Sequence, residues 1–131
     1  RMEQMVNFEK HISQNGTKIL KFYFHMSKDE QRERLLKRLE NPEDNWKFST
    51  GDLKERALWD DYMKYYEEAI NKTSTDFAPW YIVPADDKGV ARYIVAKIIW
   101  EELEKLTDIA EPELDPKVKA NIEEYRTQLK K

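Results

Sequence analysis

The run Lys18-Ile-Leu-Lys-Phe-Tyr-Phe-His-Met26 decides the fold, because it is nearly continuous in apolar, β-branched and aromatic residues. Such a run predicts a strand buried on both faces, as in parallel sheets, rather than an edge strand. Ser27 follows it and stands three residues before Glu30, the spacing of a capping box. A helix is therefore expected to run from here to about Glu40, where Asn41-Pro42 ends it.

A second helix is expected after the loop 42–48. Ser49 stands three residues before Asp52 and can cap a helix that reaches about Asn71. Its apolar stripe is expected to face the core and consists of Leu58, Tyr62, Tyr65, Tyr66 and Ala69. The stretch 32–56 thus predicts a basic helical hairpin suited to close over an anion. On charge pattern alone, a solvated helix face is the commoner explanation.

Outside the hairpin, a second strand is expected at about 79–85, a short apolar run bounded by prolines. Residues 86–89 predict a turn, and 90–106 a helix that covers the sheet. The buried face expected for this helix comprises Ala91, Ile94, Val95, Ile98, Ile99 and Leu103. Residues 2–15 predict a short amphipathic helix that Asn15-Gly16 ends. Three tryptophans are expected in the core or over the sheet: Trp59, Trp80 and Trp100.

The elements together predict an α/β fold: two parallel strands, at about 18–26 and 79–85, joined by a right-handed helical crossover. Residues 1–106 are expected to form one partial domain with the hairpin at about 28–71. Residues 107–131 are expected to form a linker and a terminal helix, striped by Val118, Ile122, Tyr125 and Leu129. Two strands are few for a doubly wound sheet, so further strands are expected upstream of Arg1. The first strand would then expose an edge that invites pairing.

Composition excludes several classes of protein. The 131 residues carry a net charge of −3 and no cysteine, which excludes disulfide scaffolds, zinc knuckles and thiol nucleophiles. The negative balance argues against coating of nucleic acid, so any polyanion site must be a local basic patch. No apolar run approaches the length of a membrane span, and a cytoplasmic location is the expectation.

Specific runs of the chain also carry a family resemblance. From Phe8 to Leu106 the sequence closely resembles the C-terminal part of the polyphosphate kinase type 2 family. The matching runs are Gly16–Gln31, Arg34-Leu-Leu-Lys-Arg-Leu-Glu-Asn-Pro42, Asn45-Trp-Lys-Phe-Ser49, Asp52-Leu-Lys-Glu-Arg56, Leu58-Trp-Asp-Asp-Tyr62, Thr73-Ser-Thr75, Ala78-Pro-Trp80 and Pro84-Ala-Asp-Asp-Lys88.

The resemblance implies a function for the parent protein. Members of the family are P-loop kinases that move a phosphoryl group between polyphosphate and a nucleoside mono- or diphosphate, with magnesium, under a helical lid. On this resemblance the hairpin is the lid, and the chain is a fragment that lacks the Walker A and Walker B segments. No G-x-x-x-x-G-K motif occurs in the sequence. The chain alone is therefore not expected to be a competent kinase, and catalytic groups and Mg²⁺ ligands are expected upstream.

The same resemblance implies binding residues. Four basic side chains of the lid are expected to contact polyphosphate: Arg34, Arg38, Lys47 and Arg56. Arg38 and Lys47 are the preferred pair. Trp46 and Phe48, which flank Lys47, are expected to anchor the loop rather than to stack on a base. Ion pairs along the helix with Glu30 and Glu33, and a local pair between Asp52 and Arg56, are the structural alternatives.

Nucleotide contacts are expected from Lys88 and Arg92, which follow the carboxyl end of the second strand. The alternative is that residues 86–88 only turn the chain and cap a helix. Asp60 and Asp61 face in different directions and do not form a carboxylate site, and His11 and His25 lack companions at metal-ligand spacing.

Partners and competing functions complete the expectations. The partners expected are polyphosphate, a nucleotide, and either a homo-oligomer or a chain that pairs at the open sheet edge, with no membrane and no nucleic acid. Two other functions stay open. One is a non-enzymatic helical interaction module that uses the terminal stripe, and the other is part of a nucleoside monophosphate kinase. Nucleotide preference and the direction of transfer are left undetermined.

Overall fold

The computed structural model describes residues 1–107 and 109–130. The chain divides into two compact units, Arg1–Trp100 and Glu101–Lys131.

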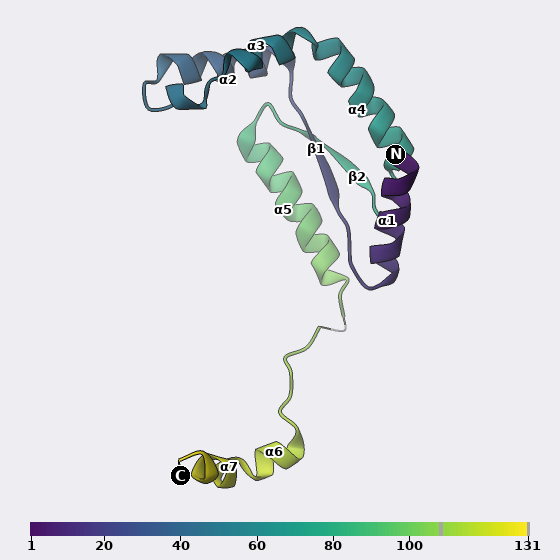
Figure 1. Cartoon of the computed structure of the whole chain (residues 1–131), viewed down its shortest axis with the longest axis vertical. Coiled ribbons are helices and arrows are strands. Elements are labelled where there is room, and N and C mark those ends of the chain that lie inside the picture. The colour runs from purple at the N-terminus through teal and green to yellow at the C-terminus, as the bar shows by residue number, and fades with distance from the viewer. Residues whose placement is uncertain (108, 131) are drawn as a thin grey trace. The chain divides into compact units, whose positions relative to one another are not determined.

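The first unit is built on a two-stranded parallel sheet, which confirms the predicted fold class. β1 (Lys21–His25) pairs with β2 (Trp80–Pro84) in a register that sets Lys21 opposite Trp80. Both strands are shorter than expected. Figure 1 shows the sheet between α5 (Lys88–Glu104) on one side and helices α1 (Met2–Gln14) and α4 (Trp59–Thr73) on the other. Helices thus flank both sides of the sheet.

Helix α1 (Met2–Gln14) ends as its sequence predicts. Gly16 has a φ of +88°, a backbone conformation that glycine adopts without steric cost. The Gly16 N–H donates to the Ser13 carbonyl and the Thr17 N–H to the Ile12 carbonyl, both at 3.1 Å. This pair of bonds is the Schellman motif, which satisfies carbonyls that the helix end would otherwise leave unpaired.

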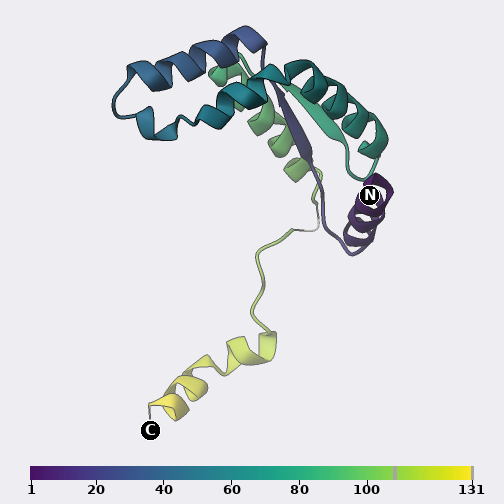
Figure 2. The ribbon, with the colours of Figure 1, turned by 45° about the horizontal axis from the view of Figure 1, so that its top comes forward.

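The hairpin comprises α2 (Lys28–Glu40), the short 3-10 helix η1 (Asn45–Lys47) and α3 (Thr50–Ala57). Both predicted caps are confirmed. The Glu30 N–H donates to the Ser27 hydroxyl at 3.1 Å, and Ser49 forms a capping box in which its own N–H donates to the Asp52 carboxylate at 3.2 Å. Figure 2 shows α2 and α3 running alongside each other.

The expectation of one continuous helix to Asn71 is wrong, because the helix breaks at Leu58. α3 ends at Ala57 and α4 spans Trp59–Thr73. The Leu58 N–H donates to the Glu55 carbonyl, three residues back, in place of an α-helical bond. Charge favours the break: basic residues occupy the last turn of α3 and acidic residues the first turn of α4, as the helix dipoles prefer.

The core of the unit is small and lies around β2. Val83 and Ala78 are fully buried, and Phe22 stacks on Tyr81 with ring centroids 5.5 Å apart. α4 contacts the sheet through Tyr66, whose ring lies 5.0 Å from that of Tyr23.

Several side chains expected in the core are exposed instead. Phe24 is 53% exposed, so β1 is not buried on both faces. The following residues were expected in the apolar stripes or, for the tryptophan, in the core, and are exposed: Leu58, Tyr62, Tyr65, Tyr66, Ile99, Trp100 and Leu103. The physical reason is the width of the sheet. Two strands offer a narrow surface, and it cannot cover the full apolar face of a helix on each side.

The second unit contains α6 (Pro116–Ala120) and α7 (Ile122–Leu129), so the predicted single terminal helix is interrupted. The break falls at Asn121, whose side-chain amide donates to the Lys117 carbonyl at 2.9 Å. An interaction role for this unit stays a prediction. Within residues 1–107 and 109–130, no helix is both long and apolar enough to cross a membrane.

Candidate functional site

The candidate site lies at the carboxyl ends of β1 and β2. Because the strands are parallel, these ends share one edge of the sheet, which is where open α/β sheets bind ligands. The hairpin leaves this edge from β1, and α5 leaves it from β2. The elements that carry the predicted binding residues therefore start at the same edge.

A set of polar contacts, here called the junction, joins the base of the hairpin to the loop after β2; it consists of Ser27, Glu30, Arg34, Ala85 and Asp86. The Ser27 N–H donates to the Asp86 carboxylate at 2.7 Å. The Arg34 guanidinium donates to the carbonyls of Ala85 and Asp86, at 2.8 and 3.1 Å, and to the Glu30 carboxylate at 2.7 Å. Hydrogen bonds from Ser27 lower the pKa of Asp86 below its ordinary range.

Arg56 ties the end of α3 to the start of α2. Its guanidinium donates to the Lys28 carbonyl at 2.6 Å and to the Gln31 side-chain oxygen at 3.0 Å. The alternative of a local pair with Asp52 is not found among the contacts of the described residues. Asp52 instead serves the capping box of α3 and lies 3.9 Å from Arg38.

Arg38 faces a hollow between the two hairpin helices. The hollow measures about 310 Å³ and is lined by Met26, Gln31, Arg34, Leu35, Arg38, Asp52 and Glu55. The Arg38 side chain is 42% exposed, and its ion pair with Asp52 is long. The structure therefore brings Arg34 and Arg38, four residues apart on α2, to one hollow in the company of two acidic side chains.

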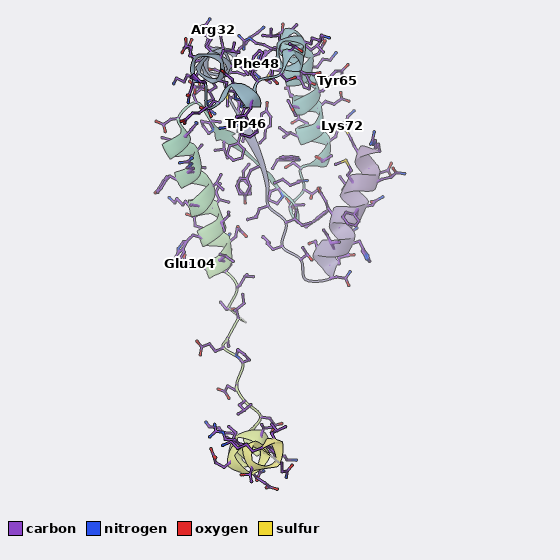
Figure 3. The ribbon with its side chains drawn as sticks, turned by 60° about the vertical axis from the view of Figure 1, so that its left-hand side comes forward. Arg32, Trp46, Phe48, Tyr65, Lys72 and Glu104 are labelled. Carbon is purple, nitrogen blue, oxygen red and sulfur yellow. The ribbon has the colours of Figure 1, made fainter. Side chains whose placement is uncertain are left out.

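Lys47 lies in the loop of the hairpin. Its ammonium is 2.5 Å from the Asp44 carboxylate and 5.4 Å from the centre of the Trp46 ring. The hydrogen bond from Lys47, followed by one from Asn41, lowers the pKa of Asp44. Trp46 is 79% exposed, so the expectation that its ring anchors the loop is wrong, whereas Phe48 is half-buried. Figure 3 labels Trp46 and Phe48 in the hairpin.

Lys88 and Arg92 lie in the first turns of α5 and are exposed. Within the described residues, neither side chain makes a hydrogen bond or an ion pair. Asp87 caps the helix, because its carboxylate accepts from the Val90 N–H at 2.9 Å. A hollow of about 460 Å³ lies at this sheet edge and is lined by His25, Ser27, Ile82, Pro84, Ala85, Asp86, Asp87 and Val90. In the chain, Lys88 lies between the lining residues Asp87 and Val90 and Arg92 follows Val90, but neither basic residue is part of the lining.

The described residues contain no cluster of three or more potential metal ligands. Across residues 1–107 and 109–130, no group of three or more His, Cys, Asp or Glu side chains is placed to hold a metal ion. Mg²⁺ requires oxygen ligands in near-octahedral geometry, and in proteins one or two carboxylates usually hold it together with substrate phosphates and water. Its ligands in the parent enzyme therefore stay a prediction.

Sequence reasoning missed the long-range part of the site. It assigned residues 86–88 to a turn and a helix cap; Asp87 does cap α5, but Asp86 binds the base of the hairpin. The signal available in the sequence was that two carboxylates are adjacent. Neighbouring residues at a strand end point in different directions, so the two side chains were bound to have different partners.

Comparison with solved structures gives the class of protein. The structure matches the crystal structure of polyphosphate kinase 2 from Arthrobacter aurescens TC1 with a TM-score of 0.83 and 41% identity, over 92% of this chain and 44% of that one. Among curated proteins, the chain is 49% identical to the ADP-polyphosphate phosphotransferase of Rhodopseudomonas palustris, over 100% of this chain and 45% of the relative. It is 50% identical to the AMP/ADP-polyphosphate phosphotransferase of Meiothermus ruber, over 81% of this chain and 40% of the relative.

These relatives are named as polyphosphate phosphotransferases or as polyphosphate kinase 2. The family model Polyphosphate kinase 2 (PPK2) matches residues 1–111, and the chain belongs to that family. It spans less than half the length of the relatives named above.

Proposed function

We propose that this chain supplies the lid and the nucleotide-side elements of an enzyme that transfers phosphoryl groups between polyphosphate and nucleoside mono- or diphosphates. The family membership supports the class of reaction, and the names of two relatives specify polyphosphate with ADP or with AMP and ADP. The parent proposed is a P-loop kinase that uses Mg²⁺ held by groups outside the described residues. A cytoplasmic location and pairing through the open edge of β1 remain part of this proposal.

The observation that carries the proposal is the hairpin at the carboxyl edge of the sheet, in which Arg38 and Lys47 lie at the surface. Phosphoryl transfer needs charge neutralisation and positioning, which long basic side chains provide without making or breaking bonds themselves. Closure of such a hairpin would also exclude water from the transferring group. The chemistry assigned to this chain is therefore electrostatic.

Arg38 and Lys47 are the proposed phosphate contacts. Their side chains are 42% and 45% exposed, and each has one carboxylate partner near the surface. Exposed ion pairs contribute about 0–1 kcal/mol, so either cation can exchange its carboxylate for a phosphate at small cost. Arg34 and Arg56, also predicted to contact phosphate, are held by bonds within the hairpin and its base.

Lys88 and Arg92 are the proposed nucleotide contacts. They follow β2 at the ligand-binding edge of the sheet, and their charges have no partner among the described residues. Nucleotide phosphates are the simplest ligand for such a pair.

The test is made in the whole enzyme that contains this segment. Arg38→Ala and Lys47→Ala are each expected to lower polyphosphate-dependent turnover roughly tenfold, a loss of about 1.4 kcal/mol of transition-state stabilisation. Lys10→Ala, which removes an exposed lysine of α1, is the matched control. Unchanged rates in both hairpin variants would contradict the lid assignment.

The phosphoryl donor separates this proposal from a nucleoside monophosphate kinase. The wild-type enzyme is expected to phosphorylate its nucleotide with polyphosphate in the absence of a nucleoside triphosphate. Transfer only from a nucleoside triphosphate would favour the other kinase class.

A further inference from the structure

The junction holds Arg34 by three hydrogen bonds to groups that belong to the protein itself. Two acceptors are backbone carbonyls at the carboxyl end of β2, 51 and 52 residues away in the chain, and the third is the Glu30 carboxylate one turn earlier on α2. The Arg34 side chain is only 23% exposed. To bind a phosphate with the same nitrogen atoms, Arg34 would have to give up these bonds.

The charge of the junction also disfavours an anionic ligand. One guanidinium faces two carboxylates, those of Glu30 and Asp86, and the positive charge of Arg34 contributes to the lowered pKa of Asp86. A polyphosphate chain approaching this point would meet a local excess of negative charge. Arg38, one turn further along the helix, makes only a long ion pair, with Asp52 at 3.9 Å, and its charge also acts on Asp44.

The junction connects the two halves of the candidate site. Two sets of hydrogen bonds cross it, and the hairpin donates in both: Arg34 of α2 donates to backbone carbonyls of the loop after β2, and Asp86 of that loop accepts from Ser27, the residue that caps α2. Arg56 holds the other side of the same helical turn through the Lys28 carbonyl. The first turn of α2 is thereby fixed between α3 and the loop that leads to Lys88.

We propose that Arg34 is a positioning residue that, together with Asp86, sets the base of the hairpin relative to the start of α5. It would act through the placement of Arg38 and Lys47 over the site instead of contacting polyphosphate. The inference rests on the proposed lid function for its effect on catalysis. The bonds that carry it are independent of that function.

The experiment compares four single variants of the whole enzyme: Arg34→Ala, Arg34→Lys, Asp86→Ala and the control Arg32→Ala. Arg32 lies on the same helix and makes only surface pairs with Asp29 and Glu33 at 54% exposure. Lysine keeps the charge but lacks the planar fork that reaches a carboxylate and two carbonyls together.

A positioning role predicts a pattern that a phosphate contact does not. Arg34→Ala and Asp86→Ala should each lower kcat about tenfold with less than about a twofold change in KM for polyphosphate. The double variant Arg34→Ala with Asp86→Ala should have a kcat only slightly lower than either single variant. Arg34→Lys should resemble Arg34→Ala, and Arg32→Ala should match the wild type. A raised KM for polyphosphate that lysine restores, a wild-type Asp86→Ala, or additive losses would each overturn the proposal.

Hydrogen exchange gives a readout that does not depend on activity. Amides of residues 27–40 should exchange faster in Arg34→Ala and Asp86→Ala than in the wild type or Arg32→Ala, whereas amides of β2 should keep their protection and report an intact fold. Unchanged exchange in residues 27–40 would overturn the junction. If the wild-type enzyme showed no transfer from polyphosphate, the proposed function would fail while this measurement still decided the role of the junction.

Discussion

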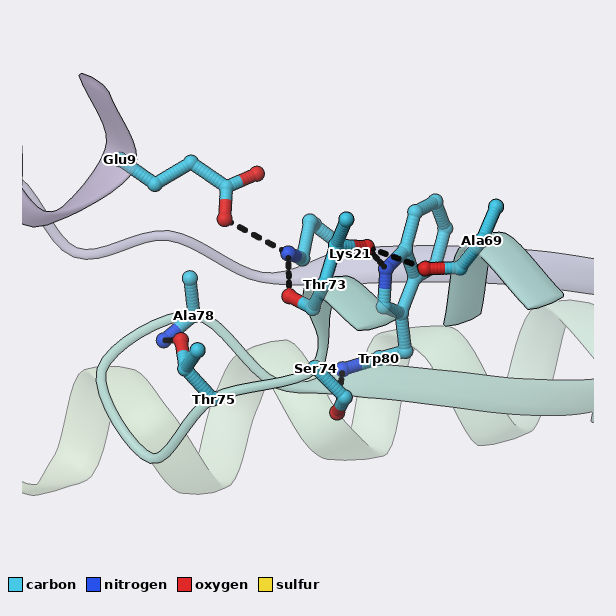
Figure 4. A network of polar contacts seen from close by, with 8 residues as sticks. All are labelled: Glu9, Lys21, Ala69, Thr73, Ser74, Thr75, Ala78 and Trp80. Atoms are coloured by element: carbon cyan, nitrogen blue, oxygen red, sulfur yellow. Dashed lines mark hydrogen bonds and ion pairs between the residues drawn. The ribbon is translucent and has the colours of Figure 1, made fainter. Parts of the chain in front are cut away.

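The ammonium group of Lys21 lies 2.7 Å from a carboxylate oxygen of Glu9, and the two side chains are only 12% and 15% exposed. Lys21 also donates to the Thr73 carbonyl at 2.7 Å and lies 5.3 Å from the centre of the Trp80 ring. Figure 4 shows this network, which joins α1, β1, the end of α4 and the start of β2. The first unit, with few buried apolar side chains, therefore depends on polar contacts between its elements.

Loss of Lys21 is expected to destabilise the protein strongly. Lys21→Met leaves the Glu9 carboxylate nearly buried without its partner, which should lower the free energy of unfolding by about 3 kcal/mol. The double variant Lys21→Met with Glu9→Leu replaces the pair by apolar groups and should recover most of the loss. Urea denaturation measures both values, and equal stabilities of the wild type and Lys21→Met would contradict the prediction.

Thr73 is expected to matter through its hydroxyl group. The Trp80 indole N–H donates to this hydroxyl at 2.9 Å, the hydroxyl donates to the Ala69 carbonyl at 2.7 Å, and Thr73 is 4% exposed. Thr73→Val keeps the shape but leaves the indole N–H unpaired, at a cost of about 1–2 kcal/mol in unfolding free energy.

A matched threonine provides the control for this effect. The Thr127 hydroxyl donates to the Glu123 carbonyl at 2.8 Å on an exposed surface of α7, so Thr127→Val should cost less than about 0.5 kcal/mol. Thermal unfolding followed by tryptophan fluorescence compares the two variants. Similar melting temperatures would show that the buried hydroxyl has no special role.

Gly16 is expected to resist substitution because of its backbone. Its φ of +88° disfavours any side chain, so Gly16→Ala should destabilise the protein by about 1 kcal/mol even though no atom lies within 4 Å of the new Cβ. Gly51→Ala is the comparison. Gly51 lies inside α3 and lacks a positive φ, and its Cβ would meet the Ser49 hydroxyl at 3.3 Å, so a smaller change is expected. Equal effects in chemical denaturation would argue against backbone strain at Gly16.

Local sequence rules predicted the ends of several helices. The stop at Asn15-Gly16 and the starts at Ser27 and Ser49 each depend on residues within four positions of one another, and each is found as expected. The break at Leu58 was within reach of the same rules, because its flanking charges favour one helix end followed by one helix start. The apolar stripe begins at Leu58, the break itself, and therefore did not reveal that one helix ends there and another starts.

Contacts between distant segments could not be predicted from the sequence. Arg34 was expected near phosphate on the family resemblance, yet two of its partners are backbone carbonyls 51 and 52 residues away, which carry no residue-type signal. The stripe of α5 misled in a similar way. The stripe shows that one face of α5 is apolar, but it does not show whether other parts of this chain cover that face. Trp100, for example, is 63% exposed.

Acidification is expected to weaken the junction through Asp86. Hydrogen bonds from the Ser27 N–H and hydroxyl favour the carboxylate and lower the pKa of Asp86 in the folded protein, whereas the unfolded chain has the ordinary value of about 3.9. The unfolded state then binds more protons at acidic pH. The contribution of Asp86 to stability is fully present above the unfolded-state pKa and is lost as pH falls through the folded-state pKa.

Asp86→Asn keeps an acceptor for the Ser27 N–H but cannot titrate, so its unfolding free energy should fall less steeply between about pH 5 and pH 2. Urea denaturation across this pH range measures the unfolding free energies of the wild type and Asp86→Asn. Because both proteins share the other carboxylates, the contributions of those groups cancel in the difference. Parallel stability curves for the two proteins would show that Asp86 does not couple protonation to the junction.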